Sequence, residues 1–391
     1  MAWVAYAYAI YMAQSGDYTP ALYLQRMLNF LLALQSADAD LRNGLLYVGY
    51  GKYQDPGYQF VPGLQNYVST EHNVDAYFAF KRAARVLPTA ATQLLKTGAI
   101  TGAQATALNS TAAAVSSVAD TIASQLIANL YIAPGADPGH FAQGANSAGL
   151  DTSQALDAAG TWSALLCHAI GDDVKATECL KFVYQKFYLA NQQILKSVAT
   201  NSYNQAYQQL QPFSGFKPYN DSSGGYSGSP ASVWQEGTWG MITALLRLYH
   251  VPSVTSYFGG VEGSLDAFLA KLISGQSIVR STTGDGSLVN YSLASRSLPY
   301  ELEVWPAASA TAWFWATAMN PSALLATDTD PQSLPYLIIP PGQSQSVNEL
   351  DGESSIGSLE VKSIDPAGVL KALAAQQNLV GKIARFKMGF P

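Results

Sequence analysis

Apolar side chains recur along the chain at the three- and four-residue spacing of buried helix faces, in segments that long loops separate. The first two helices are expected over 2–14 and 20–36, joined by a short turn, with Pro20 suited to a first helical turn. Further helices are predicted from Thr70 to a break near Pro88, then over 102–132, 150–170, 174–196, 234–250, 261–275 and 306–321. The remainder, residues 322–391, is rich in Pro, Ser and Gly and is predicted to be largely irregular.

Four of the apolar helices follow long loops rich in Gly and aromatic residues, and their predicted starts lie at 70, 152, 235 and 306. This spacing indicates a degenerate internal repeat of loop, apolar helix, short turn and amphipathic helix. Helices joined by short turns are antiparallel neighbours, so the long loops and the polar first turns are expected on one face. The pattern predicts an all-α fold: an (α/α)5–6 toroid of helical hairpins over 1–321, with the long aromatic loops on one face. Residues 322–391 are predicted to be a short irregular extension that packs on or closes the toroid.

Composition and charge restrict the class of protein. Hydrophobic residues make up 48% of the 391 residues and charged residues only 12%, with 23 tyrosines, which favours a secreted or extracytoplasmic protein. A signal segment is not recognised at the start, so we expect it to be absent from this sequence. The net charge of −6 and the lack of basic runs argue against nucleic acid and anionic membranes as partners. The sequence has no apolar run long enough for a membrane span, and we expect a monomer.

The two cysteines, Cys167 and Cys179, lie on either side of the turn at Gly171. Two thiols without neighbouring ligands do not form a zinc site, and either a disulfide across a helical hairpin or two buried free thiols fits their spacing. The sequence contains no phosphate-binding glycine loop, nucleophile elbow or metal-spaced histidine pair, so neither a metal nor a cofactor is expected.

Three of the predicted first turns carry a carboxylate: Glu71, Asp151 and Glu236. Cleavage of a glycosidic bond uses two carboxyl groups, one as proton donor and the other as nucleophile or activator of water. A helix N-terminus favours the ionised form of one carboxylate, while a neighbouring acid raises the pKa of another, so the roles can divide without a metal. The alternative for each residue is an ordinary helix cap. Glu301 and Glu303, in the loop before the last apolar helix, are further candidates for the second acid and for substrate binding.

The other polar residues of these first turns are candidate sugar-binding groups: His72, Asn73, Gln154 and Gln235. Aromatic loop residues offer flat faces on which sugar rings can stack, with phenol and indole groups that bond hydroxyls. The loop residues expected to act in this way are Tyr50, Tyr58, Tyr219, Tyr226, Trp234, Tyr300 and Trp305. The alternatives are structural: Asn73 bonds a neighbouring loop, His72 is a satisfied structural histidine, and each aromatic ring packs within its own loop.

Five segments together resemble the six-hairpin glycosidase superfamily, the (α/α)6-barrel carbohydrate-active enzymes. They are TEHNVDAY (70–77), LDTSQAL (150–156), FSGF (213–216), WQEGTWG (234–240) and ATAWFWATAMNP (310–321). The resemblance covers residues 1–321 and implies a saccharide-binding cleft with an acidic pair, most often Glu with Asp or Glu, acting on β-linked glucans or related polysaccharides. It also implies that the chain starts inside the first inner helix of such a barrel, so that a residue contributed from upstream is missing.

These observations predict a glycoside hydrolase that cleaves a neutral, β-glucan-like polysaccharide by carboxylate general acid/base catalysis. A polysaccharide lyase on the same fold is the first alternative. It would need Tyr or His as base and Arg or Lys to hold a uronate, and basic residues are scarce in the long loops. The second alternative is a non-catalytic carbohydrate-binding or scaffold domain in which the acids are only caps.

Overall fold

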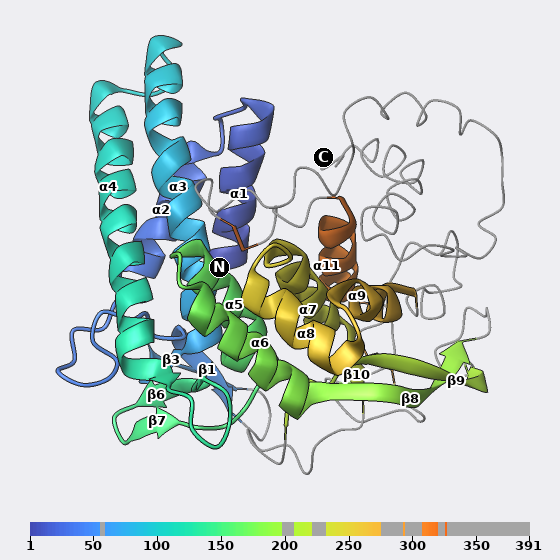
Figure 1. Ribbon diagram of the computed structural model, residues 1–391. Helices are drawn as coiled ribbons and strands as arrows, with labels where there is room; N and C mark the ends of the chain where they lie inside the picture. Colours follow the sequence, from blue (N-terminus) through green and yellow to red (C-terminus); the bar gives the residue numbers. More distant parts are fainter. Residues whose placement is uncertain are drawn as a thin grey trace, which may run out of the picture. The chain divides into compact units, whose positions relative to one another are not determined.

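The computed structural model describes residues 1–54, 59–197, 207–220, 232–274, 292–293, 307–319 and 325–326. These residues are mostly helical, which confirms the helical class (Figure 1). They form two compact units. The first contains Met1–Phe182 together with Leu325 and Ala326, and the second contains the other described residues after Phe182. The toroid of hairpins and the domain limits 1–321 and 322–391 remain predictions.

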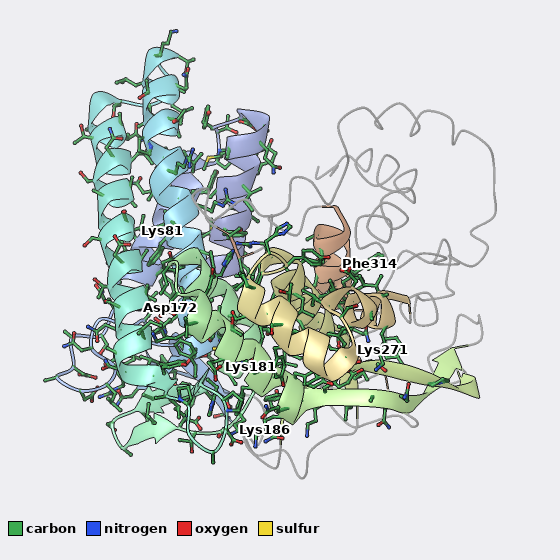
Figure 2. The ribbon with its side chains drawn as sticks, viewed as in Figure 1. Lys81, Asp172, Lys181, Lys186, Lys271 and Phe314 are labelled. Carbon is green, nitrogen blue, oxygen red and sulfur yellow. The ribbon has the colours of Figure 1, made fainter. Side chains whose placement is uncertain are left out.

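The first unit is built on long helices. They are α1 (Ala2–Ser15), α2 (Ala21–Leu32), α3 (Thr70–Lys96), α4 (Gly102–Gln125), α5 (Trp162–Ala169) and the first part of α6 (Asp173–Phe187), with the π-helical segments η1 (Leu126–Leu130) and η2 (Asp157–Thr161). α3 and α4 lie side by side, and α1 and α2 pack against them (Figure 1). At the surface of this group lies Lys81 of α3, labelled in Figure 2. Its Nζ is 2.5 Å from Asp120 Oδ1 of α4.

Local sequence explains where two of these helices begin and end. At the start of α4, Thr101 Oγ1 accepts the Gln104 N–H at 3.2 Å, and Gln104 Oε1 accepts the Thr101 N–H at 2.8 Å. This reciprocal cap satisfies two backbone donors that have no partner within the helix. α1 ends at Gly16, whose φ of 70° is a left-handed conformation that glycine adopts without a steric penalty.

Short antiparallel strands fill the segments between these helices. β3 (Tyr67–Ser69), β6 (Gly144–Asn146) and β7 (Gly149–Asp151) form a three-stranded sheet, β1 (Tyr50–Gln54) pairs with β2 (Gln59–Leu64), and β4 (Tyr131–Ile132) pairs with β5 (His140–Phe141). Because β3 runs directly into α3, the three-stranded sheet fixes the start of that helix.

The second unit is organised around a buried helix. Its elements are β8 (Tyr188–Ser197), β9 (Tyr207–Phe216), β10 (Val233–Trp234), α7 (Gln235–Arg247), α8 (Pro252–Glu262), α9 (Leu265–Ser274), β11 (Ser292–Leu293) and α11 (Ala308–Met319). Nearly every residue of α7 is buried, and α7 packs against α9 and α11. The rings of Trp239 on α7 and Phe314 on α11 meet edge to face, with centroids 4.9 Å apart. Phe314 is labelled in Figure 2. In the part of the chain that the structure describes, no helix has the length and apolar character needed to cross a membrane.

The predicted helix over 174–196 is wrong beyond Phe187, because the chain continues as β8 and pairs with β9, part of the predicted loop 208–234. A bulge between Leu189 and Gln192 falls within β8, and Asn191 in this bulge has a φ of 51°. The break near Pro88 is also wrong: Pro88 lies within α3 on its exposed side, where water can solvate the carbonyl left without an N–H partner.

Three further predicted helices have different limits. The segment 102–132 leaves the α-helix after Gln125 and ends as η1 and β4. The helix near 261–275 is α9, which begins at Leu265, and the preceding helix α8 was not predicted. The predicted helix over 150–170 starts later, because Leu150 and Asp151 belong to β7 and the helical segment η2 begins at Asp157. This last correction changes the candidate site.

Candidate active site

Glu71 lies in the first turn of α3, at a point held by the sheet beneath it. The Ser69 hydroxyl caps the helix by accepting the His72 N–H at 3.4 Å. Thr70 donates its hydroxyl to Ala142 O at 2.6 Å and its N–H to Gln143 O at 2.9 Å. These bonds attach the first turn to the short segment between β5 and β6, so the half-buried Glu71 side chain starts from a fixed backbone.

Close packing at Gly144 also helps to fix the start of α3. Gly144 faces Ser69 across the sheet, and a Cβ placed on it would lie only 2.1 Å from Val68 O. Glycine therefore allows β6 to approach the end of β3 closely enough to hold the start of α3.

The partner of Glu71 is Asp157, a residue that sequence reasoning missed. Asp157 is the first residue of η2, is only 7% exposed, and its carboxylate is hydrogen-bonded to the Glu71 side chain. Its Oδ1 also accepts the Ala158 N–H at 2.7 Å. The packing of α3 against η2 brings the two carboxyl groups together. The signal in the sequence that could have found Asp157 is that it is the one charged residue in the otherwise apolar or small segment 155–167.

The electrostatics of this pair follow from its contacts. Burial raises the pKa of Asp157. Three hydrogen bonds lower this pKa and offset part of the rise: those from the N–H groups of Ala158 and of Asp157 itself, and the one with Glu71. Two carboxyl groups in hydrogen-bonding contact cannot both be ionised at low cost, so the pair retains one proton. Because backbone N–H groups can only donate, they favour Asp157 as the acceptor of the hydrogen bond between the two carboxyl groups.

Asp151 is not in a helical first turn, and its carboxylate is occupied by local contacts. Oδ1 accepts the N–H and the hydroxyl of Ser153, at 3.0 and 2.6 Å, and Oδ2 accepts the Tyr67 hydroxyl at 3.0 Å. Burial and the adjacent Asp151 charge raise the pKa of Tyr67, which keeps that phenol as a donor. These contacts make Asp151 a structural residue that stabilises the end of β7, and we leave it out of the proposed site. Gln154 is half-buried in the turn between β7 and η2.

The two residues that follow Glu71 differ in their surroundings. Asn73 is fully buried, and its side-chain amide exchanges two hydrogen bonds with the main chain of Leu46: Oδ1 accepts the N–H at 2.7 Å and Nδ2 donates to the carbonyl at 3.0 Å. Nδ2 also donates to Ser69 O at 2.8 Å, so Asn73 anchors a neighbouring loop, and its full burial keeps it from contact with a sugar. His72 is exposed, yet enough protein surrounds its ring to disfavour the imidazolium and lower its pKa.

In the second unit, α7 starts at Gln235 as predicted. Trp234, in β10, is 7% exposed and forms the N-cap, and Glu236 is half-buried in the first turn. Gln235 is fully buried, and neither polar atom of its side chain has a hydrogen-bond partner within the described ranges of the chain. Thr238 closes this turn by donating its hydroxyl to Trp234 O at 2.7 Å.

Among the predicted aromatic residues, Tyr50 is 59% exposed on β1 and Tyr219 is half-buried. On β2, Phe60 is 54% exposed and its ring lies against Gly51, because a Cβ added there would come within 2.1 Å of Phe60 Cζ. The remaining candidates lie outside the described residues: Tyr58, Tyr226, Tyr300, Glu301, Glu303 and Trp305. Within the described ranges, no group of three or more His, Cys, Asp or Glu side chains is arranged to hold a metal ion.

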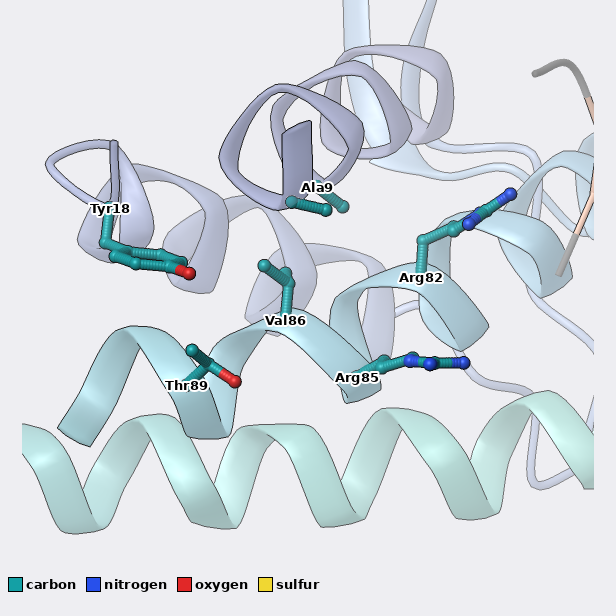
Figure 3. Close-up of a pocket in the computed structure, with 7 residues that line it drawn as sticks. Ala9, Tyr18, Arg82, Arg85, Val86 and Thr89 are labelled. Atoms are coloured by element: carbon teal, nitrogen blue, oxygen red, sulfur yellow. The ribbon is translucent and has the colours of Figure 1, made fainter. Parts of the chain in front are cut away.

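A separate cavity of about 180 Å³ lies along α3, between that helix, α1 and the turn at Tyr18. Arg82 and Arg85 extend from α3 in the same direction, with Thr89 one turn further on (Figure 3). Arg82 Nε donates to Ala326 O at 2.8 Å, and the Tyr6 hydroxyl bonds the same residue, so this region holds the segment at 325–326. Eleven helical residues separate Arg82 from Glu71, about 16 Å along the axis, so the cavity does not include the carboxyl pair.

Models of known protein families give no match to this chain, and a search among curated proteins gives none either. What the site can do is therefore inferred from its own residues.

Proposed function

We propose that the protein is a glycoside hydrolase that cleaves a neutral β-linked polysaccharide, with Glu71 as the general acid and Asp157 as the residue that positions its proton. The observation that carries the proposal is the hydrogen bond between the half-buried Glu71 and the buried Asp157. A carboxyl group that keeps its proton near a solvent-facing helix start is what protonation of a leaving glycosidic oxygen requires.

The contact between these two residues also supports the roles that we propose for them. The two carboxyl groups of a glycosidase lie about 5–5.5 Å apart when one is the nucleophile, and about 6.5–9.5 Å apart when one activates water. Glu71 and Asp157 are in direct contact, so they act as one proton-holding unit. A second carboxylate is still required, and Glu236, in the first turn of the buried helix α7, stays a sequence-based prediction for that role.

The finer fold assignment, an (α/α)5–6 toroid, is part of the same proposal, as are a secreted location and a monomeric state. Sugar stacking is assigned to exposed aromatic rings such as Tyr50, which is 59% exposed beside the start of the β1–β2 hairpin. The scarcity of basic residues fits a neutral substrate better than a uronate.

The test is reducing-sugar release from a panel of neutral and acidic polysaccharides between pH 3 and 7. It compares wild type with Glu71→Gln, Asp157→Asn and Glu236→Gln, and with Asp120→Asn, an exposed carboxylate on α4, as the matched control. We expect hydrolysis of a neutral glucan, a loss of at least about 100-fold in kcat for Glu71→Gln and Glu236→Gln, and no change for the control.

Asp157→Asn separates positioning from a purely structural role. A neutral amide no longer opposes loss of the proton from Glu71, so the alkaline limb of the kcat profile should move to lower pH while KM stays constant. Activity that survives Glu71→Gln, or a wild type that is inactive on every polysaccharide of the panel, would refute the proposal.

A further inference from the structure

Two buried thiols meet between α5 and α6. Cys167 lies near the end of α5 and Cys179 in the second turn of α6, and both side chains are 0% exposed. The thiols are in hydrogen-bonding contact and are not joined by a covalent bond. The chain reverses between the two helices at Gly171, whose φ of 81° permits the tight turn. The hairpin therefore places the two sulfur atoms together.

The surroundings of the pair exclude two other uses of adjacent cysteines. Burial and the neighbouring Cys167 raise the pKa of Cys179 well above its ordinary value, so this thiol is not a reactive nucleophile in the folded protein. A zinc site would need two further ligands, and the described residues hold no cluster of metal-ligating side chains. Tyr131 and Lys175 lie near both thiols, with Lys175 Nζ 5.5 Å from the Tyr131 ring centre. Neither supplies a ligand that completes such a site.

We propose that Cys167 and Cys179 form an intrachain disulfide when the protein folds in an oxidising environment, and that this bond locks α5 to α6. The contact between the thiols in the hairpin is the geometry from which the bond closes. α5 continues directly from η2, so the bond also secures the helical segment that begins with Asp157. The inference does not depend on the proposed hydrolase activity.

The chemistry is thiol–disulfide exchange with a low-molecular-weight disulfide such as oxidised glutathione. The thiolate of one cysteine attacks the glutathione disulfide, forms a mixed disulfide and releases one glutathione as its thiol. The thiolate of the second cysteine then attacks the protein sulfur of that bond and releases the second glutathione. The protein loses two protons and two electrons in all, and one glutathione disulfide becomes two thiols. Because both sulfur atoms are buried, exchange takes place before the hairpin closes or during its local opening.

The experiment compares wild type with the double variant Cys167→Ala/Cys179→Ala, each refolded from urea in oxidised or in reduced glutathione. Every sample is quenched with acid, alkylated under denaturing conditions and weighed intact by mass spectrometry, and its Tm is measured in parallel. For wild type refolded in oxidised glutathione we expect no alkylation, a mass lower by two hydrogen atoms, and a Tm roughly 5–10 °C above the reduced form. The double variant should have the same Tm in both buffers.

The mass measurement on wild type decides the proposal even if the variant folds poorly. Alkylation of both cysteines after refolding in oxidised glutathione would overturn it. Glutathione retained on either cysteine, or a disulfide between two chains, would overturn it as well, since each outcome means that the two sulfur atoms do not close on one another.

Discussion

Replacing Asn73 by alanine tests whether this residue is a structural anchor or a sugar-binding group. The Asn73 amide mimics a strand, because it both accepts from and donates to the main chain of Leu46. On its other side this loop is joined to residues 34–36 by two hydrogen bonds, from Ser36 N to Leu45 O and from Tyr47 N to Leu34 O. Neither bond uses the main chain of Leu46, so its N–H and carbonyl both face Asn73. Leu46 is 3% exposed, so water does not replace the lost partner without rearrangement.

The magnitude follows from these two orphaned groups. A buried donor or acceptor left unsatisfied costs about 1–3 kcal/mol, so Asn73→Ala should lower the free energy of unfolding by about 4 kcal/mol. The third partner of the Asn73 side chain is Ser69 O. This carbonyl is also the acceptor for the α-helical N–H of residue 73, so loss of its bond to the side chain adds little to the cost of the substitution. The measurements are urea unfolding and hydrogen exchange of the Leu46 amide, which should lose its protection.

Two further variants sharpen this test. Asn29→Ala, at an exposed position of α2, should change the free energy of unfolding by less than about 0.5 kcal/mol. Asn73→Asp keeps the acceptor for the Leu46 N–H but, when ionised, cannot donate to the Leu46 carbonyl, so it should be more stable at acid pH than at neutral pH. A loss below about 1 kcal/mol in Asn73→Ala, with unchanged exchange at Leu46, would refute the anchoring role.

Two predictions concern the carboxyl pair and the strand beside it. Burial raises the native pKa of Asp157, so its stabilising contribution is complete below the unfolded value of about 3.9 and is lost as pH rises through the native value. Asp157→Asn should therefore gain stability relative to wild type as pH rises from 4 to 7 in urea unfolding, and a constant difference would contradict this. Gly144→Ala would force a Cβ against Val68 O and should destabilise the protein by about 2 kcal/mol or more, whereas Gly135→Ala, with open space around it, should be neutral by the same assay.

The starts of some helices could be predicted from the sequence, because neighbouring residues in the chain determine them. α3 begins at Thr70 and α7 at Gln235, where a polar first turn precedes an apolar run, and α1 and α2 follow from apolar spacing alone. The strand β8 could not be predicted in this way. Its residues are compatible with a helix, and only pairing with β9, which lies beyond residue 206, makes them a strand.

The same distinction between local and distant contacts explains the error at Asp151. Its neighbour Ser153 forms a turn with it, a pattern close to that of a helix cap, but pairing of β7 with β6 keeps Asp151 in a strand. Asp157 could not be recognised as the partner of Glu71, because the two residues are far apart in sequence and meet only through the packing of α3 on η2.

The chemistry of Asp157 separates the functional interpretation from the structural one. A residue needed only to accept the N–H of Ala158 could be Asn or Ser, whose side-chain oxygens also accept hydrogen bonds and carry no charge to bury. Asp157 is instead buried against a second carboxyl group, an arrangement that lowers stability at neutral pH and is typical of sites where a proton must be held. Substitution by Asn keeps an acceptor oxygen for the Ala158 N–H and removes the charge. If Asp157 serves only as that acceptor, this variant will keep its activity and its pH profile. If it holds the proton of Glu71, the variant will be more stable at neutral pH and less active, and no structural role of the carboxylate predicts both changes together.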